Sequence, residues 1–138
     1  MDRIQRDRMI EKLDSLKNLK EWKAYIQNLL QFNDNAVKSA LSLLFSLQEE
    51  DEKRDNKSVH ENGVGFNKVD ADFLGRMAKR VNAGMDLTDS QMQACRWALM
   101  KYWRQLTDRS KENLAKLKKQ RELDMAREPE QLKLPGME

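Results

Sequence analysis

The sequence predicts an all-α protein, a small bundle of about four to five helices with a long charged C-terminal helix and a flexible tail. The chain has 138 residues with only two prolines and five glycines, and both prolines lie near the C-terminus. Apolar residues recur at helical spacing, and no segment shows the alternation of a β-strand. We expect N-terminal helices at 1–49, a loop at 50–67, a basic helical module at 68–127 and a flexible tail at 128–138.

The N-terminal segment predicts helices on either side of a turn. Residues 2–19 carry an approximate apolar stripe, and residues 20–32 continue or restart that helix. Asn33 to Asn35 form a turn that offers an N-cap for the next helix. One face of that next helix is apolar and is expected to be buried: Ala36, Val37, Ala40, Leu41, Leu44 and Leu47.

A helix over about 68–82 follows the main loop. Its expected buried stripe has four-residue spacing and consists of Val69, Phe73, Met77 and Val81. Gly84 is expected to end this helix with a left-handed cap.

A long helix then begins at a capping-box pattern, with Thr88 as the N-cap and Gln91 at the third helical position. Thr107-Asp108 is a candidate interruption or kink, and residues 109–127 continue as charged helix with sparse apolar anchors at Leu114, Leu117 and Leu123. In the part of this helix before Thr107, one side is expected to face the core; it consists of Met92, Cys95, Leu99, Tyr102, Trp103 and Leu106.

The composition argues against a membrane or disulfide-bonded protein. No apolar run approaches the roughly 20 residues that span a bilayer, and the N-terminal residues do not read as a signal peptide. The single Cys95 excludes an internal disulfide and a cysteine zinc cluster. We therefore expect a cytoplasmic location, in the cytoplasm of a host cell.

Few residues suggest catalysis. The only histidine, His60, lies in a polar loop without a second metal ligand beside it. Asp70 and Asp72 suit the start of a helix, where carboxylates stabilise the helix dipole. Cys95 falls on the expected core side. The sequence therefore predicts a protein that is not an enzyme and that needs no cofactor or metal.

The charge is unevenly distributed along the chain. Residues 1–67 hold 11 basic and 12 acidic residues, residues 68–121 hold 13 basic and 6 acidic, and the remainder holds 2 basic and 5 acidic. These counts give net charges of −1, +7 and −3. A basic centre suggests a polyanionic partner, and solvated helix faces are the alternative explanation.

The predicted nucleic-acid-binding face lies on the long helix. At about 100° per residue, Trp97, Lys101 and Arg104 share one face, where cations could neutralise phosphates and an indole could stack on an unpaired base. Packing of Trp97 against the N-terminal helices or in a dimer interface is the alternative. The full predicted set is Lys68, Arg76, Lys79, Arg80, Arg96, Trp97, Lys101 and Arg104. Loop residues Gly63, Gly65 and Asn67 are expected to approach the nucleic-acid backbone, and amides at the start of the following helix are expected to contact phosphate.

The C-terminal tail contains a candidate docking peptide. The string from Gln131 to Pro135 resembles the short motif by which bacterial replication proteins dock on the sliding clamp. By that resemblance, Gln131 enters a polar site while Leu132 and Leu134 fill an apolar pocket. The final aromatic or leucine of the strong motif is missing here.

A longer pattern resembles a module that recurs in phage, prophage and plasmid proteins. It combines an acidic stretch at Glu50–Glu52 with Asn62–Asn67, Asp70-Ala71, Leu87–Gln91 and Lys101–Leu106. The module is similar to segments of DNA-metabolism proteins, including regions attached to helicases. The resemblance covers somewhat under half of the chain and implies a mobile-element setting, but it supplies no catalytic residues.

Three hypotheses follow. The first is an accessory protein of phage DNA replication or recombination that binds nucleic acid, with DNA favoured over RNA. The second is a phage-encoded adaptor or inhibitor that binds a host replication or defence protein through its helical faces, while the tail peptide would bind the sliding clamp. The third is a structural component that forms homo-oligomers through the long helix.

Overall fold

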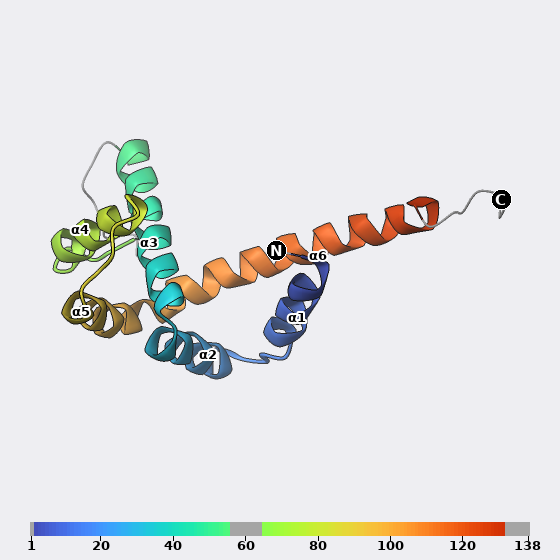
Figure 1. The fold of residues 1–138 in the computed structure, drawn as a ribbon, viewed down its shortest axis with the longest axis horizontal. Coiled ribbons are helices and arrows are strands. Elements are labelled where there is room, and N and C mark those ends of the chain that lie inside the picture. The colour runs from blue at the N-terminus through green and yellow to red at the C-terminus, as the bar shows by residue number, and fades with distance from the viewer. Residues whose placement is uncertain (1, 56–64, 132–138) are drawn as a thin grey trace. The chain divides into compact units, whose positions relative to one another are not determined.

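The computed structural model describes residues 2–55 and 65–131, with side chains described outside 51–55 and 128–131. The described residues form six α-helices and one 3₁₀ turn (Figure 1), which confirms the all-α class and the long C-terminal helix. The elements are α1 (Arg3–Asp14), α2 (Leu19–Phe32), α3 (Asp34–Asp55), α4 (Ala71–Asn82), α5 (Asp89–Leu99), η1 (Met100–Tyr102) and α6 (Trp103–Gln131).

The described residues divide into two compact units. The central unit comprises Lys20–Thr107, and the terminal unit comprises the residues up to Leu19 together with those from Asp108 onward. The boundary falls within α6, so this helix contributes residues to both units. The expected segments 1–49 and 68–127 are each shared between these two units.

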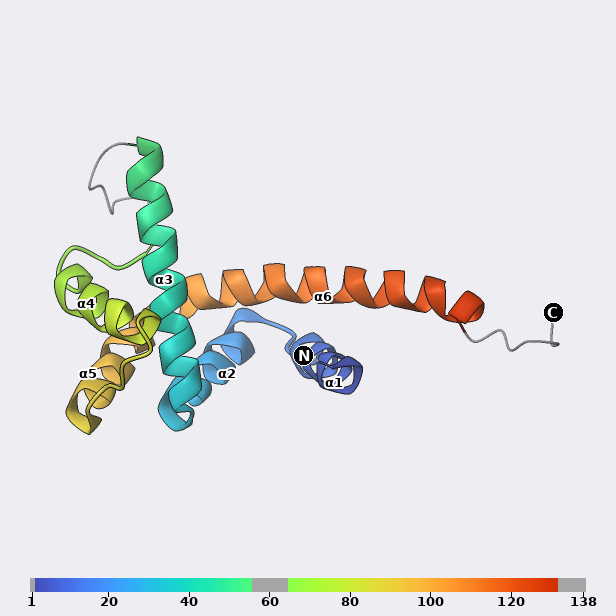
Figure 2. The same ribbon diagram turned by 45° about the horizontal axis from the view of Figure 1, so that its top comes forward.

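The core of the central unit forms around α3, which packs against α4 and α5 (Figures 1 and 2). Val37, Leu41 and Leu44 recur at helical spacing on α3, and all three are fully buried. They share one hydrophobic cluster with Leu74 of α4 and Leu99 of α5. Each such side chain contributes about 1.5–3 kcal/mol on burial. The predicted apolar face of α3 is thus confirmed.

Local capping explains where several helices begin and end. The Asn33 side-chain oxygen accepts a hydrogen bond from the Ala36 N–H at 3.0 Å, as an N-cap does. Thr88 and Gln91 form the predicted capping box at the start of α5. Gly84 follows α4 with a φ of 76°, which confirms the expected left-handed residue.

Several expected boundaries are wrong. The helix α3 continues to Asp55, into the expected loop at 50–67, and α6 continues to Gln131, into the expected tail at 128–138. The first helix stops at Asp14 rather than near residue 19, and the Ser15 hydroxyl donates to the Lys12 carbonyl, a local bond that competes with helix continuation. The expected 68–82 helix begins only at Ala71. Val69 therefore lies in a turn, where it is 88% exposed, instead of on the buried stripe. Of the expected stripe, Met77 is buried, and Phe73 and Val81 are half-buried.

The long helix is interrupted at η1 rather than at Thr107-Asp108. Met100–Tyr102 form a 3₁₀ turn, whereas α6 continues through Thr107, which is fully buried. The Met100 carbonyl accepts a hydrogen bond from the Gln27 side chain at 3.2 Å. A 3₁₀ turn adds about 20° of rotation per residue relative to an α-helix. Residues after η1 therefore face a different direction from the one that an unbroken helix predicts.

The terminal unit pairs α1 with the later part of α6. Arg6, Ile10 and Leu13 form one buried stripe on α1. Arg6 forms an ion pair with Asp124, and Lys118 pairs with Asp14 at 2.6 Å. Of the expected apolar anchors, Leu114 and Leu117 are half-buried, but Leu123 is exposed.

Candidate functional site

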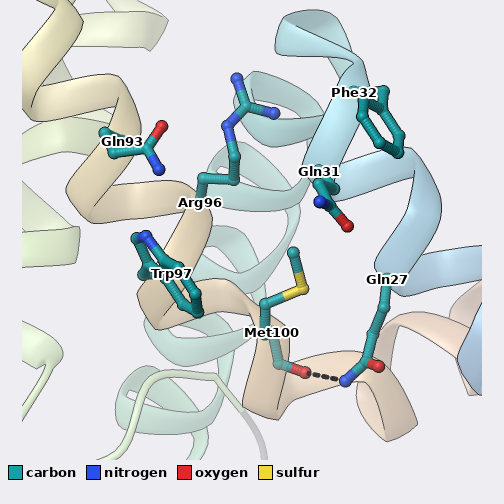
Figure 3. A pocket seen from close by; sticks show the side chains of 7 residues that line it. All are labelled: Gln27, Gln31, Phe32, Gln93, Arg96, Trp97 and Met100. Carbon is teal, nitrogen blue, oxygen red and sulfur yellow. Dashed lines mark hydrogen bonds between the residues drawn. The ribbon is translucent and has the colours of Figure 1, made fainter.

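An open groove lies between α2 and the segment formed by α5 and η1, within the central unit (Figure 3). Its volume is about 650 Å³. This volume is within the range of small-molecule and cofactor sites. The lining residues are Gln27, Gln31 and Phe32 from α2, Gln93, Arg96 and Trp97 from α5, and Met100 from η1.

Two exposed aromatic side chains stand on opposite sides of this groove. Trp97 is 71% exposed and Phe32 is 74% exposed. Figure 3 shows them projecting from α5 and α2, with the half-buried Met100 between the two helices. The alternative in which Trp97 packs against the N-terminal helices is therefore wrong. Exposed large apolar side chains gathered around a hollow are typical of a binding surface.

Glutamine side chains supply the polar part of the groove. Gln27 donates to the Met100 carbonyl and so links α2 to η1 (Figure 3). Gln31 and Gln93 project from the two walls and are exposed. Each carboxamide has two N–H donors and one acceptor oxygen. The groove can therefore form hydrogen bonds with ligand groups that donate and with ligand groups that accept.

Arg96 organises the groove instead of offering a free cation to it. Its guanidinium donates to the Leu30 carbonyl near the end of α2 and to the Asp34 carboxylate at the start of α3. The side chain is only 12% exposed. A cation at the end of one helix and a carboxylate in the first turn of the next both complement the helix dipoles. Arg96 thereby fixes the corner between α2 and α3.

A cation–aromatic contact extends the α2 side of the groove. The Lys23 amino group lies 5.4 Å from the Trp103 ring centroid. Lys23, Gln27 and Gln31 are spaced four residues apart, so they lie along one face of α2. The face of α2 that carries the groove residues Gln27 and Gln31 therefore also carries Lys23, whose amino group lies beside Trp103.

The 3₁₀ turn η1 lies within the expected common face of Trp97, Lys101 and Arg104. Its three residues add roughly 60° of rotation, which moves Arg104 from about 20° on one side of Trp97 to about 40° on the other. The Lys101 amino group binds the Asp70 carboxylate at 2.7 Å, just before α4, and does not line the groove. Arg104 is exposed on α6.

The other predicted basic residues lie around α4. Arg76 pairs with Asp72 at 3.4 Å, and both side chains are largely exposed. Lys79 lies over the Phe45 ring, and Arg80 donates to the Asp86 carbonyl at 3.1 Å. Lys68 is exposed in the turn before the helix. None of these side chains lines the groove.

The predicted loop contacts are used within the protein. The Gly65 N–H is bound by Gln105, and the Asn67 N–H is bound by the Tyr102 hydroxyl. At the start of the following helix, where amides were expected to contact phosphate, the Asp70 N–H donates to the Asn67 side chain and the Ala71 N–H to the Asn67 carbonyl. Gly63 lies outside the described residues. The same is true of Leu132, Leu134 and the side chain of Gln131.

The described part of the chain contains no group of three or more side chains that could hold a metal ion together. His60 lies outside it. Burial raises the pKa of the Cys95 thiol to about 11, and the side chain is fully enclosed. In the same described ranges no helix has the length and apolar character needed to cross a membrane.

The α2 wall of the groove was missed in the sequence. The buried stripe of α2 is Trp22, Ile26 and Leu30. Phe32 is about 200° from Leu30 around the helix, so it points away from the core. An aromatic residue at the end of a helix and off its apolar stripe is the signal that could have identified this wall.

Comparisons of this chain with protein-family models, with curated proteins and with solved structures find no match.

Proposed function

We propose that this protein binds single-stranded nucleic acid, preferentially DNA, by accepting an unstacked base in the groove beside Trp97. The observation that carries this proposal is the 71% exposed Trp97 on an open groove whose other wall bears the 74% exposed Phe32. Stacking of a base on an aromatic side chain contributes about 1–3 kcal/mol. A duplex keeps its bases stacked inside and would leave Trp97 unused.

The polar groups around the groove suit the rest of a nucleotide. The exposed carboxamides of Gln31 and Gln93 can hydrogen-bond base edges, which present both donors and acceptors. Lys23 and Arg104 are exposed cations on α2 and at the start of α6. Phosphate neutralisation by such cations makes affinity depend on salt. The site binds a ligand and performs no reaction.

The biological setting is part of the same proposal. The basic region of the sequence and its resemblance to phage and plasmid modules support an accessory role in the DNA replication or recombination of a mobile element. Such a role needs a protein that holds transiently single-stranded DNA without chemistry, which agrees with the groove.

Binding of labelled single- and double-stranded oligonucleotides at two salt concentrations tests the proposal. Trp97→Ala should weaken single-strand binding by roughly 5- to 150-fold, which corresponds to about 1–3 kcal/mol. Met85→Ala removes a half-exposed apolar side chain that does not line the groove and serves as the matched control. Absence of binding at low salt, or equal affinity of the Trp97→Ala variant and the wild type, would overturn the proposal.

A second function, binding of a host protein, is favoured by the neutrality of the groove. Among the described residues that line it, Arg96 alone is charged, and it is already paired with Asp34. Two aromatics and a methionine beside glutamine amides also suit an apolar peptide, as an adaptor or inhibitor requires. Recovery of a partner from nuclease-treated host lysate, and its loss with Trp97→Ala, would support this function. Deleting residues 129–138 separately tests the clamp-docking prediction.

A further inference from the structure

The later part of α6 carries a concentrated positive charge. From Asn113 to Arg121 the helix contains four cations and no carboxylate: Lys116, Lys118, Lys119 and Arg121. The nearest acidic residues of the helix are Glu112 and Glu122 at either side. This segment belongs to the terminal unit and lies apart in sequence from every groove residue.

The cations of this segment fall on two faces of the helix. Half-buried residues form one stripe at helical spacing, namely Ser110, Leu114, Leu117, Lys118, Arg121 and Asp124. Asp14 and Arg6 of α1 bind this stripe at Lys118 and Asp124. Lys116 and Lys119 are exposed and point away from it, because they lie about 160° and 100° around the helix from Lys118.

Three of the nearby carboxylates bind other side chains. Glu112 binds Arg109 at 2.7 Å, Asp14 binds Lys118 at 2.6 Å, and Asp124 binds Arg6 and Gln120. The Arg6 hydrogen bond, followed by that from Gln120, holds the pKa of Asp124 below its usual value, so this carboxylate stays ionised on the α1 side. Lys116 and Lys119 are both exposed, and Glu122 is the exposed carboxylate that follows them on the helix.

We propose that the exposed face of α6 around Lys116 and Lys119 is a second nucleic-acid contact that binds the phosphate backbone. The two residues are one helical turn apart, with about 4.5 Å of rise between them, so their flexible side chains can reach adjacent phosphates of one strand. This face has no exposed aromatic residue, so it contributes charge without base stacking. The inference rests on the proposed function, because it concerns the same partner.

An anionic membrane surface is the other polyanion that a basic helix could meet. A helix that binds in a membrane interface needs an exposed apolar face opposite its basic one. On this segment the leucines at 114 and 117 lie on the half-buried stripe that α1 contacts. The observations therefore favour nucleic acid.

The test measures single-stranded DNA affinity as a function of salt for the full chain. The K116Q/K119Q double variant should bind more weakly at low salt, and the slope of log affinity against log salt should fall by about 1.4, or about 0.7 for each lost phosphate contact. Glutamine has nearly the helix propensity of lysine, so the helix is retained. R8Q/K38Q removes the same charge from the exposed Arg8 of α1 and the half-buried Lys38 of α3 and serves as the charge control.

The outcomes separate the two proposals. If the wild type binds and only K116Q/K119Q lowers the slope, the α6 contact is supported. If the wild type binds but K116Q/K119Q and R8Q/K38Q give equal slopes, the α6 contact is wrong and the groove proposal stands. If the wild type binds no DNA at low salt, both proposals fail. Binding to phosphatidylserine vesicles that K116Q/K119Q abolishes, with unchanged DNA affinity, would also overturn the α6 proposal.

Discussion

The side-chain amide of Gln105 satisfies both backbone groups of Gly65. Its oxygen accepts from the Gly65 N–H at 2.8 Å, and its Nε2 donates to the Gly65 carbonyl at 3.1 Å. Gly65 is buried with a φ of 79°, so its backbone needs such partners away from water. Gln105 of α6 thus forms with Gly65 the pair of hydrogen bonds that a residue of a neighbouring strand would form, and it fixes the backbone before α4.

Gly65→Ala should destabilise the protein far more than Gly84→Ala. Both glycines have positive φ, which costs an alanine about 1–2 kcal/mol. At Gly65 an added Cβ would also lie 2.6 Å from the Gln48 Cβ and 3.0 Å from its Cα, so backbone must move. At Gly84 nothing lies within 4 Å. Urea unfolding followed by circular dichroism gives both free energies, and equal losses would contradict the close packing at Gly65.

Tyr102→Phe should cost about 1–3 kcal/mol of unfolding free energy at neutral pH. The hydroxyl accepts from the Asn67 N–H at 2.9 Å and donates to the Asp70 carboxylate at 2.7 Å, where Lys101 also binds. The substitution leaves two polar groups short of a partner. Phe66 packs edge-on against the ring in both proteins, so the apolar contact is kept. Urea unfolding at pH 7 measures the difference.

The same tyrosine predicts a pH dependence. Burial, opposed in part by the Asn67 hydrogen bond, raises the pKa of Tyr102 well above its ordinary value of 10.0. As the pH rises past about 10, the unfolded chain releases this proton before the folded protein does. The stability due to the protonated hydroxyl is therefore complete below pH 10 and is lost above it. Unfolding at pH 9 and 11 should show a smaller loss for Tyr102→Phe than for the wild type.

The sequence predicted the core of this protein better than its surface. The apolar face of α3, the burial of Cys95 and the cap at Thr88 follow from spacing within one helix, and all are confirmed. The groove forms between side chains of two helices. The spacing of apolar residues within one helix does not predict which other helix lies beside it. Three residues of the family-like pattern were interpreted as a functional loop and face, namely Gly65, Asn67 and Lys101. In the structure Gly65 binds Gln105, and the other two bind Asp70 in the turn before α4. A single sequence does not distinguish polar residues that stabilise the fold through tertiary contacts from polar residues that bind a ligand.

Cys95 should be almost unreactive in the folded protein. Its pKa of about 11 leaves roughly 0.1% thiolate at pH 8, about a hundredfold less than the ordinary value of 9.0 gives. Enclosure in the core slows the reaction further. Labelling with a chromogenic disulfide should be slow in buffer and complete within seconds to minutes in denaturant. Rapid labelling in buffer, with an unchanged circular dichroism spectrum, would contradict the packing around Cys95.

Arg96→Gln should lower stability without changing the salt dependence of DNA binding. The guanidinium joins the Leu30 carbonyl to the Asp34 carboxylate and is 12% exposed, so its loss leaves these acceptors short of a partner. Hydrogen bonds to charged groups contribute about 1.5–3 kcal/mol. Arg76→Gln, which breaks an exposed pair with Asp72, should cost less than about 1 kcal/mol and is the control. Urea unfolding and oligonucleotide titrations at several salt concentrations measure both properties. A reduced salt slope with unchanged stability would mean that Arg96 contacts phosphate, as the sequence alone predicted, and that its bonds to Leu30 and Asp34 are not maintained in solution.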